Sequence, residues 1–180
     1  MKDALAIHRW LLAHQVHHEI VRLPRALTCA GELPEIMHAD AGHCLEVSVY
    51  EVDTRVGLEP VAVLSSVATP PRPGLVGALL GARKVHPASA FMVNAATEYA
   101  AGLVCPLLLP DDLALLVDDR LSNDLPGDTL VHTPTGERRT ALSLRASDLL
   151  RLVSGKRLDL APQARLPLQH GRRRSHPLPH

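Results

Sequence analysis

The clearest pattern along the chain is an alternation of apolar and polar positions over residues 44–52. Leu45, Val47 and Val49 alternate there with Glu46 and with a serine and a tyrosine. A period of two residues is typical of a β-strand with one buried face. A second apolar run, at residues 60–67, follows a polar loop, and we expect the two strands to pair through that loop.

The rest of the chain alternates short helices with short strands. Asp3 is placed to cap a first helix that runs to about His14, and Ser89 is placed to cap a later helix early in the range 88–96. Further helices are expected at residues 33–37, 75–80, 88–96 and 147–153, and further strands at 17–23, 83–86, 113–117, 129–132 and 140–144. The regular strand–helix alternation of a Rossmann fold is missing. We therefore predict a mixed α+β fold: a single domain with one large curved β-sheet and short flanking helices.

Composition separates a domain from a tail. Apolar residues make up 46% of the 180 residues, which is ample for one hydrophobic core. Proline, arginine and histidine dominate the end of the chain, which holds four arginines and no acidic residue from position 163 on. We predict a domain at residues 1–160 and a disordered tail at 161–180.

Charge and aromatic content restrict the partners. The formal net charge is zero, but residues 1–162 hold four more acidic than basic side chains, and aromatic residues make up only 2% of the chain. This composition argues against a broad phosphate-binding face and against an aromatic platform for single strands. We expect no DNA partner, and any RNA contact should be local or carried by the tail.

The cysteine count and the hydropathy pattern bear on the compartment. The three cysteines include no C-x-x-C pair, so they form neither a disulfide framework nor a zinc ribbon. No apolar run approaches 18 residues, and no signal segment opens the chain. We expect a cytoplasmic protein without a membrane partner.

The candidate site is the segment Thr97 to Leu108, in which a threonine and Tyr99 lead into a Gly-x-x-x-Pro element formed by residues Gly102, Leu103, Val104, Cys105 and Pro106. Glycine permits a close backbone approach, and proline fixes the far end of the turn. The three intervening N–H groups could point at a substrate oxygen, as in an oxyanion hole. An ordinary loop is the alternative interpretation.

Other candidate groups are less specific. Eleven histidines suggest a metal, but no carboxylate or cysteine falls at helical spacing with the neighbouring His14, His17 and His18, so we predict no metal and no cofactor. Cys105 as a nucleophile would need a base such as His132, and a buried structural cysteine is the favoured interpretation. Glu46 is either a solvated charge or a carboxylate at the mouth of a pocket, and the pattern favours neither.

Taken together, these segments resemble the YbaK/EbsC family of aminoacyl-tRNA deacylases, which is related to the editing domain of bacterial prolyl-tRNA synthetase. The similarity spans about residues 4–155. Residues 80–85 match the family's "leu-gly-ala-lys-lys-val" element, residues 97–106 its "thr-gly-tyr…gly-gly-x-x-pro" loop, and residues 146–149 its "ala-x-asp-leu" helix. Thr28 falls in the family's threonine-containing loop.

The resemblance implies a hydrolase that acts in trans on the ester of a mischarged tRNA, such as Cys- or Ala-tRNA(Pro), without a metal or a covalent intermediate. The Gly-x-x-x-Pro backbone would hold the ester and the terminal ribose, and a ribose hydroxyl would help to activate water. Thr28, Tyr99 and His132 would bind substrate. The partners implied are the aminoacyl-tRNA 3′ end and an aminoacyl-tRNA synthetase.

The sequence departs from the family pattern at several polar positions. Glu46 stands where the family usually has a lysine, and Val47 where a threonine or serine is common. Leu103 replaces the second glycine of the loop, and Ala141 an aspartate of the last strand. Either the substrate differs or catalysis is lost.

Two interpretations from different classes therefore stand. The first is an aminoacyl-tRNA deacylase in which Glu46 acts at the pocket rim, as a general base on water if desolvation raises its pKa. The second is a catalytically degenerate member that binds a small ligand, an aminoacyl-adenosine end or a synthetase. A metal-dependent hydrolase is a third, weaker alternative.

Overall fold

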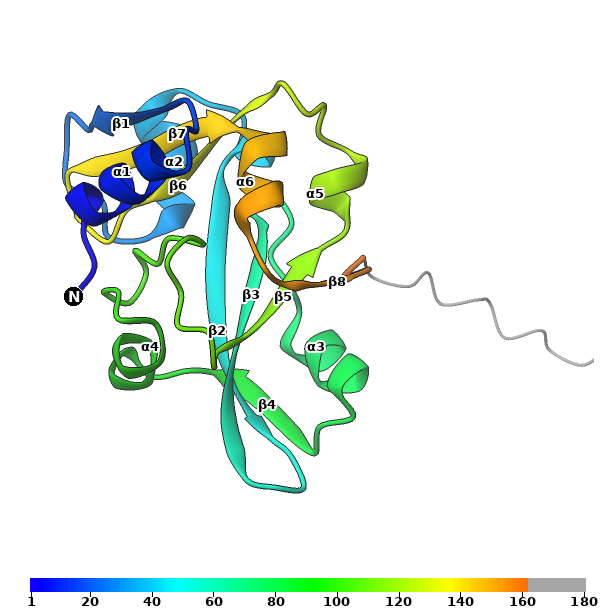
Figure 1. Cartoon of the computed structure of the whole chain (residues 1–180). Helices are drawn as coiled ribbons and strands as arrows, with labels where there is room; N and C mark the ends of the chain where they lie inside the picture. The colour runs from blue at the N-terminus through cyan, green and yellow to red at the C-terminus, as the bar shows by residue number, and fades with distance from the viewer. Residues whose placement is uncertain (162–180) are drawn as a thin grey trace, which may run out of the picture.

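Two sheets carry the fold (Figure 1). The computed structural model describes residues 1–161, so the tail predicted for 161–180 lies, from Pro162 on, outside the described residues. The smaller sheet has the strand order β1–β7–β6, and the larger one the order β4–β2–β3–β5–β8. The strands are β1 His18–Arg22, β2 Leu45–Asp53, β3 Leu58–Ser66, β4 Lys84–Pro87, β5 Ala114–Asp118, β6 Leu130–Pro134, β7 Thr140–Arg145 and β8 Lys156–Leu158. The mixed α+β class is confirmed, whereas the single large sheet was wrong.

The long β2–β3 hairpin runs through the middle of the molecule (Figure 1). Its antiparallel register pairs Leu45 with Ser66 at one end and Asp53 with Leu58 at the other, as the alternating pattern and the polar loop predicted. The remaining partners of the larger sheet differ in direction: β4 is antiparallel to β2, whereas β5 is parallel to β3 and β8 is parallel to β5. Because the sheet combines antiparallel and parallel pairs, its strand order does not follow the order of the strands along the chain.

The edge of β2 is only partly covered. Strand β4 pairs with β2 from Tyr50 to Asp53, and the N–H of Ala88 extends this contact to the carbonyl of Val49. At the other end, a single bridge between Cys44 and His132 joins the two sheets. No strand of the described residues pairs with this edge between these two points. The sheet therefore leaves a gap at residues 45–48.

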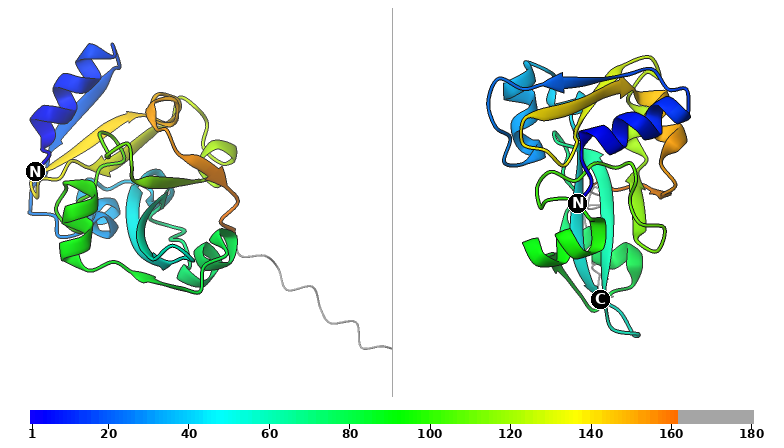
Figure 2. Two further views of the ribbon diagram at one scale, coloured as in Figure 1. Left: turned by 60° about the horizontal axis from the view of Figure 1, so that its bottom comes forward. Right: turned by 60° about the vertical axis from the view of Figure 1, so that its left-hand side comes forward.

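Short helices flank the sheets. They are α1 Ala4–Ala13, α2 Leu33–Met37, α3 Pro73–Leu80, α4 Ala90–Thr97, α5 Arg120–Asn123 and α6 Ala146–Leu152, with 3₁₀ turns at Ala30–Glu32 and Ala41–His43. The side chains of Asp3 and Ser89 accept the N–H groups of Ala6 and Met92 as N-caps, as expected from the sequence. Helix α1 lies alongside β1 (Figure 2). None of these helices is long and apolar enough to span a membrane.

Both faces of β2 are buried, each in a different core. Val49 packs with Leu45, Val93 and Val104 in the largest cluster, which also includes α1 and α6. Tyr50 and Val52 of β2 pack on the opposite face, against α3. The alternation along β2 therefore separates two cores rather than a core from solvent, which is why its tyrosine is buried.

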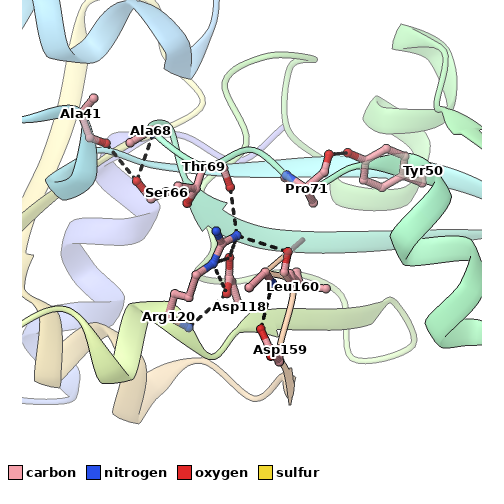
Figure 3. A network of polar contacts seen from close by, with 11 residues as sticks. Ala41, Tyr50, Ser66, Ala68, Thr69, Pro71, Asp118, Arg120, Asp159 and Leu160 are labelled. Carbon is pink, nitrogen blue, oxygen red and sulfur yellow. Dashed lines mark hydrogen bonds and ion pairs between the residues drawn. The ribbon is translucent and has the colours of Figure 1, made fainter. Parts of the chain in front are cut away.

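A buried ion pair ties three distant segments together (Figure 3). Asp118, at the end of β5, is 1% exposed, and its Oδ2 lies 2.6 Å from Nη2 of Arg120. The same nitrogen donates to the carbonyls of Thr69 and Leu160, each at 3.4 Å. The network links β5 to the loop after β3 and to the segment after β8. The nearby Tyr50 hydroxyl donates to the carbonyl of Pro71 at 3.1 Å.

Candidate active site

The segment that leads into the Gly-x-x-x-Pro loop begins at Thr97, where α4 ends. The hydroxyl of Thr97 donates to the Val93 carbonyl at 2.7 Å and accepts the N–H of Tyr99 at 3.1 Å, while Glu98 adopts a left-handed conformation that stops the helix. Tyr99 is fully buried, and its hydroxyl donates to the Leu107 carbonyl at 2.8 Å. Thr97 and Tyr99 therefore fix the two ends of the loop from inside the core.

Gly102 lies against the backbone of the Thr28 loop. Its φ is +83°, and a Cβ built on it would lie 2.6 Å from the carbonyl oxygen of Thr28. The carbonyl of Gly102 in turn accepts the N–H of Ala30 at 3.0 Å. Only glycine allows both this φ and this approach. The structure thus brings together Thr28 and Gly102, which are far apart in the sequence.

The loop's N–H groups differ in availability. The N–H of Leu103 donates to the Ala100 carbonyl at 3.0 Å, so it is not available to a ligand, contrary to the expectation from the sequence. Its side chain is buried in a separate cluster. By contrast, the N–H groups of Gly102, Val104 and Cys105 donate no hydrogen bond to any group within residues 1–161. Gly102 and Val104 also line a cavity, which makes them the best-placed donors.

That cavity has a volume of about 340 Å³ and lies in the gap along the edge of β2. Residues 46–50 form one side, and the other side is formed by the glycine loop, residues 29–30, residues 87–88 and Val93. Because the cavity opens at a strand edge, both faces of β2 border it. One face contributes Val47 and Val49, which with Val104 make an apolar wall, and the other contributes Glu46 and Ser48.

The backbone of β2 is also open to the cavity. The Val49 carbonyl accepts a hydrogen bond on this edge, from Ala88. Peptide groups alternate in direction along a strand, so the N–H and C=O of Val47 point to the same edge. No strand of the described chain covers that edge at Val47. The cavity therefore offers backbone donors and acceptors from two sides.

Glu46 is the charged residue of the cavity lining, and it is half-buried. Burial raises the pKa of its carboxyl above the usual value of 4.5. None of the ion pairs within residues 1–161 involves it. The cavity thus contains a carboxylate without an internal cation.

His132 does not line the cavity. The backbone of this residue bridges to Cys44, and its Nδ1 shares a 2.7 Å hydrogen bond with Oγ of Ser143. Burial, and secondarily the nearby His43, lower the pKa of its imidazole. The ring is therefore neutral at pH 7 and is bonded within the small sheet.

Two further residues of the candidate site face away from the cavity. Cys105 is fully buried, and burial raises the pKa of its thiol to about 12, so it is not a thiolate nucleophile at neutral pH. Pro106 lines a different cleft, beside Trp10 and Leu152. Within residues 1–161, no group of three or more histidine, cysteine or acidic side chains is arranged to hold a metal ion.

Sequence reasoning missed several cavity residues. Cys29, Ala88 and Val93 line the cavity, and Cys29 also approaches the position of a Cβ on Gly102 to 3.4 Å. The glycine and threonine loops were identified separately, but nothing in the sequence signalled that they touch. Ser48 could have been found, because it shares the Glu46 face of a correctly predicted strand.

A comparison with protein families finds a match over most of the domain. The model of the aminoacyl-tRNA editing domain matches residues 27–152, which include the Thr28 loop, β2 and the glycine loop. No curated protein matches the chain.

Several solved structures share the fold. Hypothetical protein APE2540 is 18% identical, with a TM-score of 0.71 over 86% of this chain and 97% of that chain. A protein described as a candidate trans-editing enzyme for prolyl-tRNA synthetase is 24% identical, with a TM-score of 0.65 over 81% of this chain and 87% of that chain. A scaffold from computational epitope grafting is 23% identical, with a TM-score of 0.68 over 88% of this chain and 96% of that chain. At these identities the likeness shows a common fold.

Proposed function

The chain belongs to the aminoacyl-tRNA editing domain family. From this premise we propose that it acts in trans on mischarged tRNA and hydrolyses the ester that joins a small amino acid to the tRNA, as in Cys- or Ala-tRNA(Pro). Water adds to the ester carbonyl, the ester bond breaks, and the products are the free amino acid and a tRNA with its terminal ribose hydroxyl restored. The similarity to a candidate trans-editing enzyme supports the choice of tRNA(Pro).

The observation that carries the proposal is the contact between Gly102 and the Thr28 carbonyl. Together with the hydrogen bond from Ala30 to the Gly102 carbonyl, it packs the glycine loop against the Thr28 loop beside the cavity, where the N–H groups of Gly102 and Val104 have no partner within residues 1–161. Two fixed N–H donors match the needs of a tetrahedral oxyanion, because they stabilise charge that develops only in the transition state. Cys105 has the third N–H of the loop without a partner within residues 1–161, but this residue does not line the cavity.

The cavity walls support a small amino acid. The apolar wall of Val47, Val49 and Val104 borders a volume of about 340 Å³ for the whole acyl group and the adjoining ester. A cavity of this size excludes large side chains by clash, whereas a difference of one methylene is worth only about 1–3 kcal/mol. We therefore expect discrimination by size to be coarse.

The remaining site residues act indirectly. Thr28 supplies the backbone that positions Gly102, Tyr99 anchors the loop, and Pro106 limits its far end. Water activation would come from a ribose hydroxyl of the substrate. The position of Glu46 is compatible with two contributions: activation of water, or binding of the substrate's ammonium group.

A binding protein without catalysis is the second candidate. The observation that favours it is the carboxylate of Glu46 at the cavity, because it would repel the phosphates of a tRNA 3′ end. In this case the cavity would hold an aminoacyl-adenosine end or a small ligand without cleaving it, and a synthetase could be the partner.

Single-turnover deacylation distinguishes the two candidates. The substrates are tRNA(Pro) charged with Cys, Ala, Ser or Pro, and the proteins are wild type and Gly102→Ala. We expect wild type to hydrolyse at least one of the small esters well above the uncatalysed rate and the variant to lose this activity. If wild type leaves all four esters at the uncatalysed rate, the deacylase proposal is wrong and the binding role is favoured.

A further inference from the structure

The carboxylate of Glu46 is the unusual feature of the cavity. It is half-buried, it has no cationic partner within residues 1–161, and burial raises its pKa. Its cross-strand neighbour in the register is Ser65, whose fully buried hydroxyl has no hydrogen-bond partner in the described chain. Burying a carboxylate without a cation costs free energy of folding. A ligand that brings a positive charge would offset this cost.

We propose that Glu46 binds the α-ammonium group of the amino acid to be removed, so that the cavity selects aminoacyl esters over otherwise similar esters that carry no positive charge. The inference rests on the proposed deacylase function and adds the group that recognises the substrate. It concerns one of the positions at which this chain departs from the family pattern, where a lysine is usual.

The arrangement of the cavity provides three contacts around the α-carbon of such a substrate. The glycine loop faces the ester carbonyl through Gly102 and Val104. The apolar wall accepts a small side chain. Glu46 and Ser48 come from the opposite face of β2, so the polar side of the cavity is left for the ammonium group. The open backbone edge at Val47 offers a carbonyl oxygen as a second acceptor for its N–H groups.

Ammonium binding and general-base catalysis predict different effects of removing the Glu46 carboxylate. A carboxylate that pairs with an ammonium group stays ionised and hydrogen-bonded, so its loss should affect only substrates that carry the charge. A general base would instead act on the attacking water, and its loss would slow every ester by a similar factor.

The test compares two esters of nearly equal size. Alanyl-tRNA carries an α-ammonium group, whereas lactyl-tRNA carries a hydroxyl at the same position. At pH 7 the amino group is largely protonated, because α-amino groups have pKa values of about 7.7–8.0. We expect wild type to prefer the alanyl ester by about tenfold or more in kcat/KM, and Glu46→Gln to lose most of this preference. Equal rates for both esters in wild type would overturn the inference and leave the deacylase function intact.

Binding provides a readout that does not depend on hydrolysis. Cys29 is the exposed cysteine and lines the cavity, while Cys44 and Cys105 are buried. The rate of Cys29 alkylation by N-ethylmaleimide would be measured with 3′-alanylamido- and 3′-lactylamido-3′-deoxyadenosine, whose amide bonds resist hydrolysis. We expect the alanyl compound to protect at about tenfold lower concentration in wild type but not in Glu46→Gln.

The two measurements separate the two proposals. Selective protection without hydrolysis would support ammonium binding while contradicting the deacylase function. Equal protection by both compounds, or no protection by either at millimolar concentration, would overturn ammonium binding whatever the hydrolysis assay shows. A similar loss of rate for both esters in Glu46→Gln would also overturn it and would assign Glu46 as a base.

Discussion

The carbonyl oxygen of Thr28 lies 2.6 Å from the position that a Cβ on Gly102 would occupy. An alanine there would collide with backbone rather than with a movable side chain, and it would also have to adopt a φ of +83°. We predict that Gly102→Ala displaces the loop and lowers kcat/KM for deacylation about 100-fold or more, because the N–H donors move away from the developing oxyanion. Steady-state kinetics on the preferred aminoacyl-tRNA measures this loss.

Gly81 provides the matched control. It also has a positive φ, of +61°, but a Cβ there meets nothing within 4 Å, and the residue ends α3 away from the cavity. Gly81→Ala should lower the free energy of unfolding by about 1 kcal/mol through backbone strain and leave kcat/KM near the wild-type value. If both alanine variants lose activity equally, the effect comes from stability and not from the loop.

The second prediction concerns the ion pair of Asp118 and Arg120 (Figure 3). Arg120→Ala leaves the buried Asp118 carboxylate without its cation and also removes the two donor contacts to the carbonyls of Thr69 and Leu160. We expect the free energy of unfolding to fall by about 3–5 kcal/mol. Urea titration at pH 7 measures the change.

An exposed ion pair serves as the comparison. Arg151 pairs with Asp148 along the surface of α6, and its side chain is 67% exposed. Arg151→Ala should therefore cost no more than about 1 kcal/mol. A loss for Arg120→Ala as small as this would show that Arg120 is not needed to compensate the burial of Asp118 in the native protein.

Most helices and strands could be predicted from the sequence, because helix caps and the alternation of apolar and polar positions involve residues that lie close together along the chain. Asp3 and Ser89 cap the helices that they were expected to cap, and β2 follows the alternation at residues 44–52. The family was also identified correctly from residues 80–85, 97–106 and 146–149, and the family match at 27–152 confirms it. The short elements α5 and β8 were missed, because four and three residues are too few to establish a period.

The parts of the site that depend on distant contacts could not be predicted. The division into two sheets could not be seen in the sequence, because within residues 1–161 strand β6 pairs with β7 and meets the larger sheet through the single bridge of His132 and Cys44, and no local pattern records that. The N–H of Leu103 is unavailable because the turn bonds it to Ala100. Glu46 was placed at a pocket mouth as one of two options, and only the burial of both faces of β2 distinguishes a lining carboxylate from a solvated one.

The third prediction is a dependence of stability on pH. The pKa of Glu46 is raised in the native protein by burial, so between 4.5 and the higher native value the native state binds more protons than the unfolded state. Stability contributed by this group therefore falls as pH rises through that window. Glu46→Gln cannot ionise, so we expect it to be more stable than wild type at pH 7 and to lose this advantage as the pH falls to about 4.5 and below.

Urea titrations at pH 4, 5.5 and 7 would follow the difference between the two proteins. Glu59→Gln is the control, since it removes an exposed carboxylate from the neighbouring strand β3. A Glu46→Gln protein that is equally stable as wild type at every pH would show that the carboxylate is better solvated than the cavity suggests. Ligand binding should reverse the order at pH 7 if Glu46 pairs with an ammonium group.

The fourth prediction uses the difference among the three thiols. Cys44 and Cys105 are buried, and desolvation raises their pKa values to about 11 and about 12, whereas Cys29 is exposed at the cavity beside Gly102. Because the thiolate is the reactive form, one equivalent of N-ethylmaleimide per chain should react with the native protein at pH 7 and three with the unfolded protein. Mass spectrometry of peptides should locate the native adduct at Cys29.

The adduct fills part of a cavity of about 340 Å³, so labelling should abolish deacylation in parallel with the loss of the free thiol. Cys29→Ser should retain, after the same treatment, the activity that it had before. Full activity in quantitatively labelled wild type would mean that the ester is bound elsewhere, since an adduct on Cys29 and a substrate against Gly102 cannot occupy the same space.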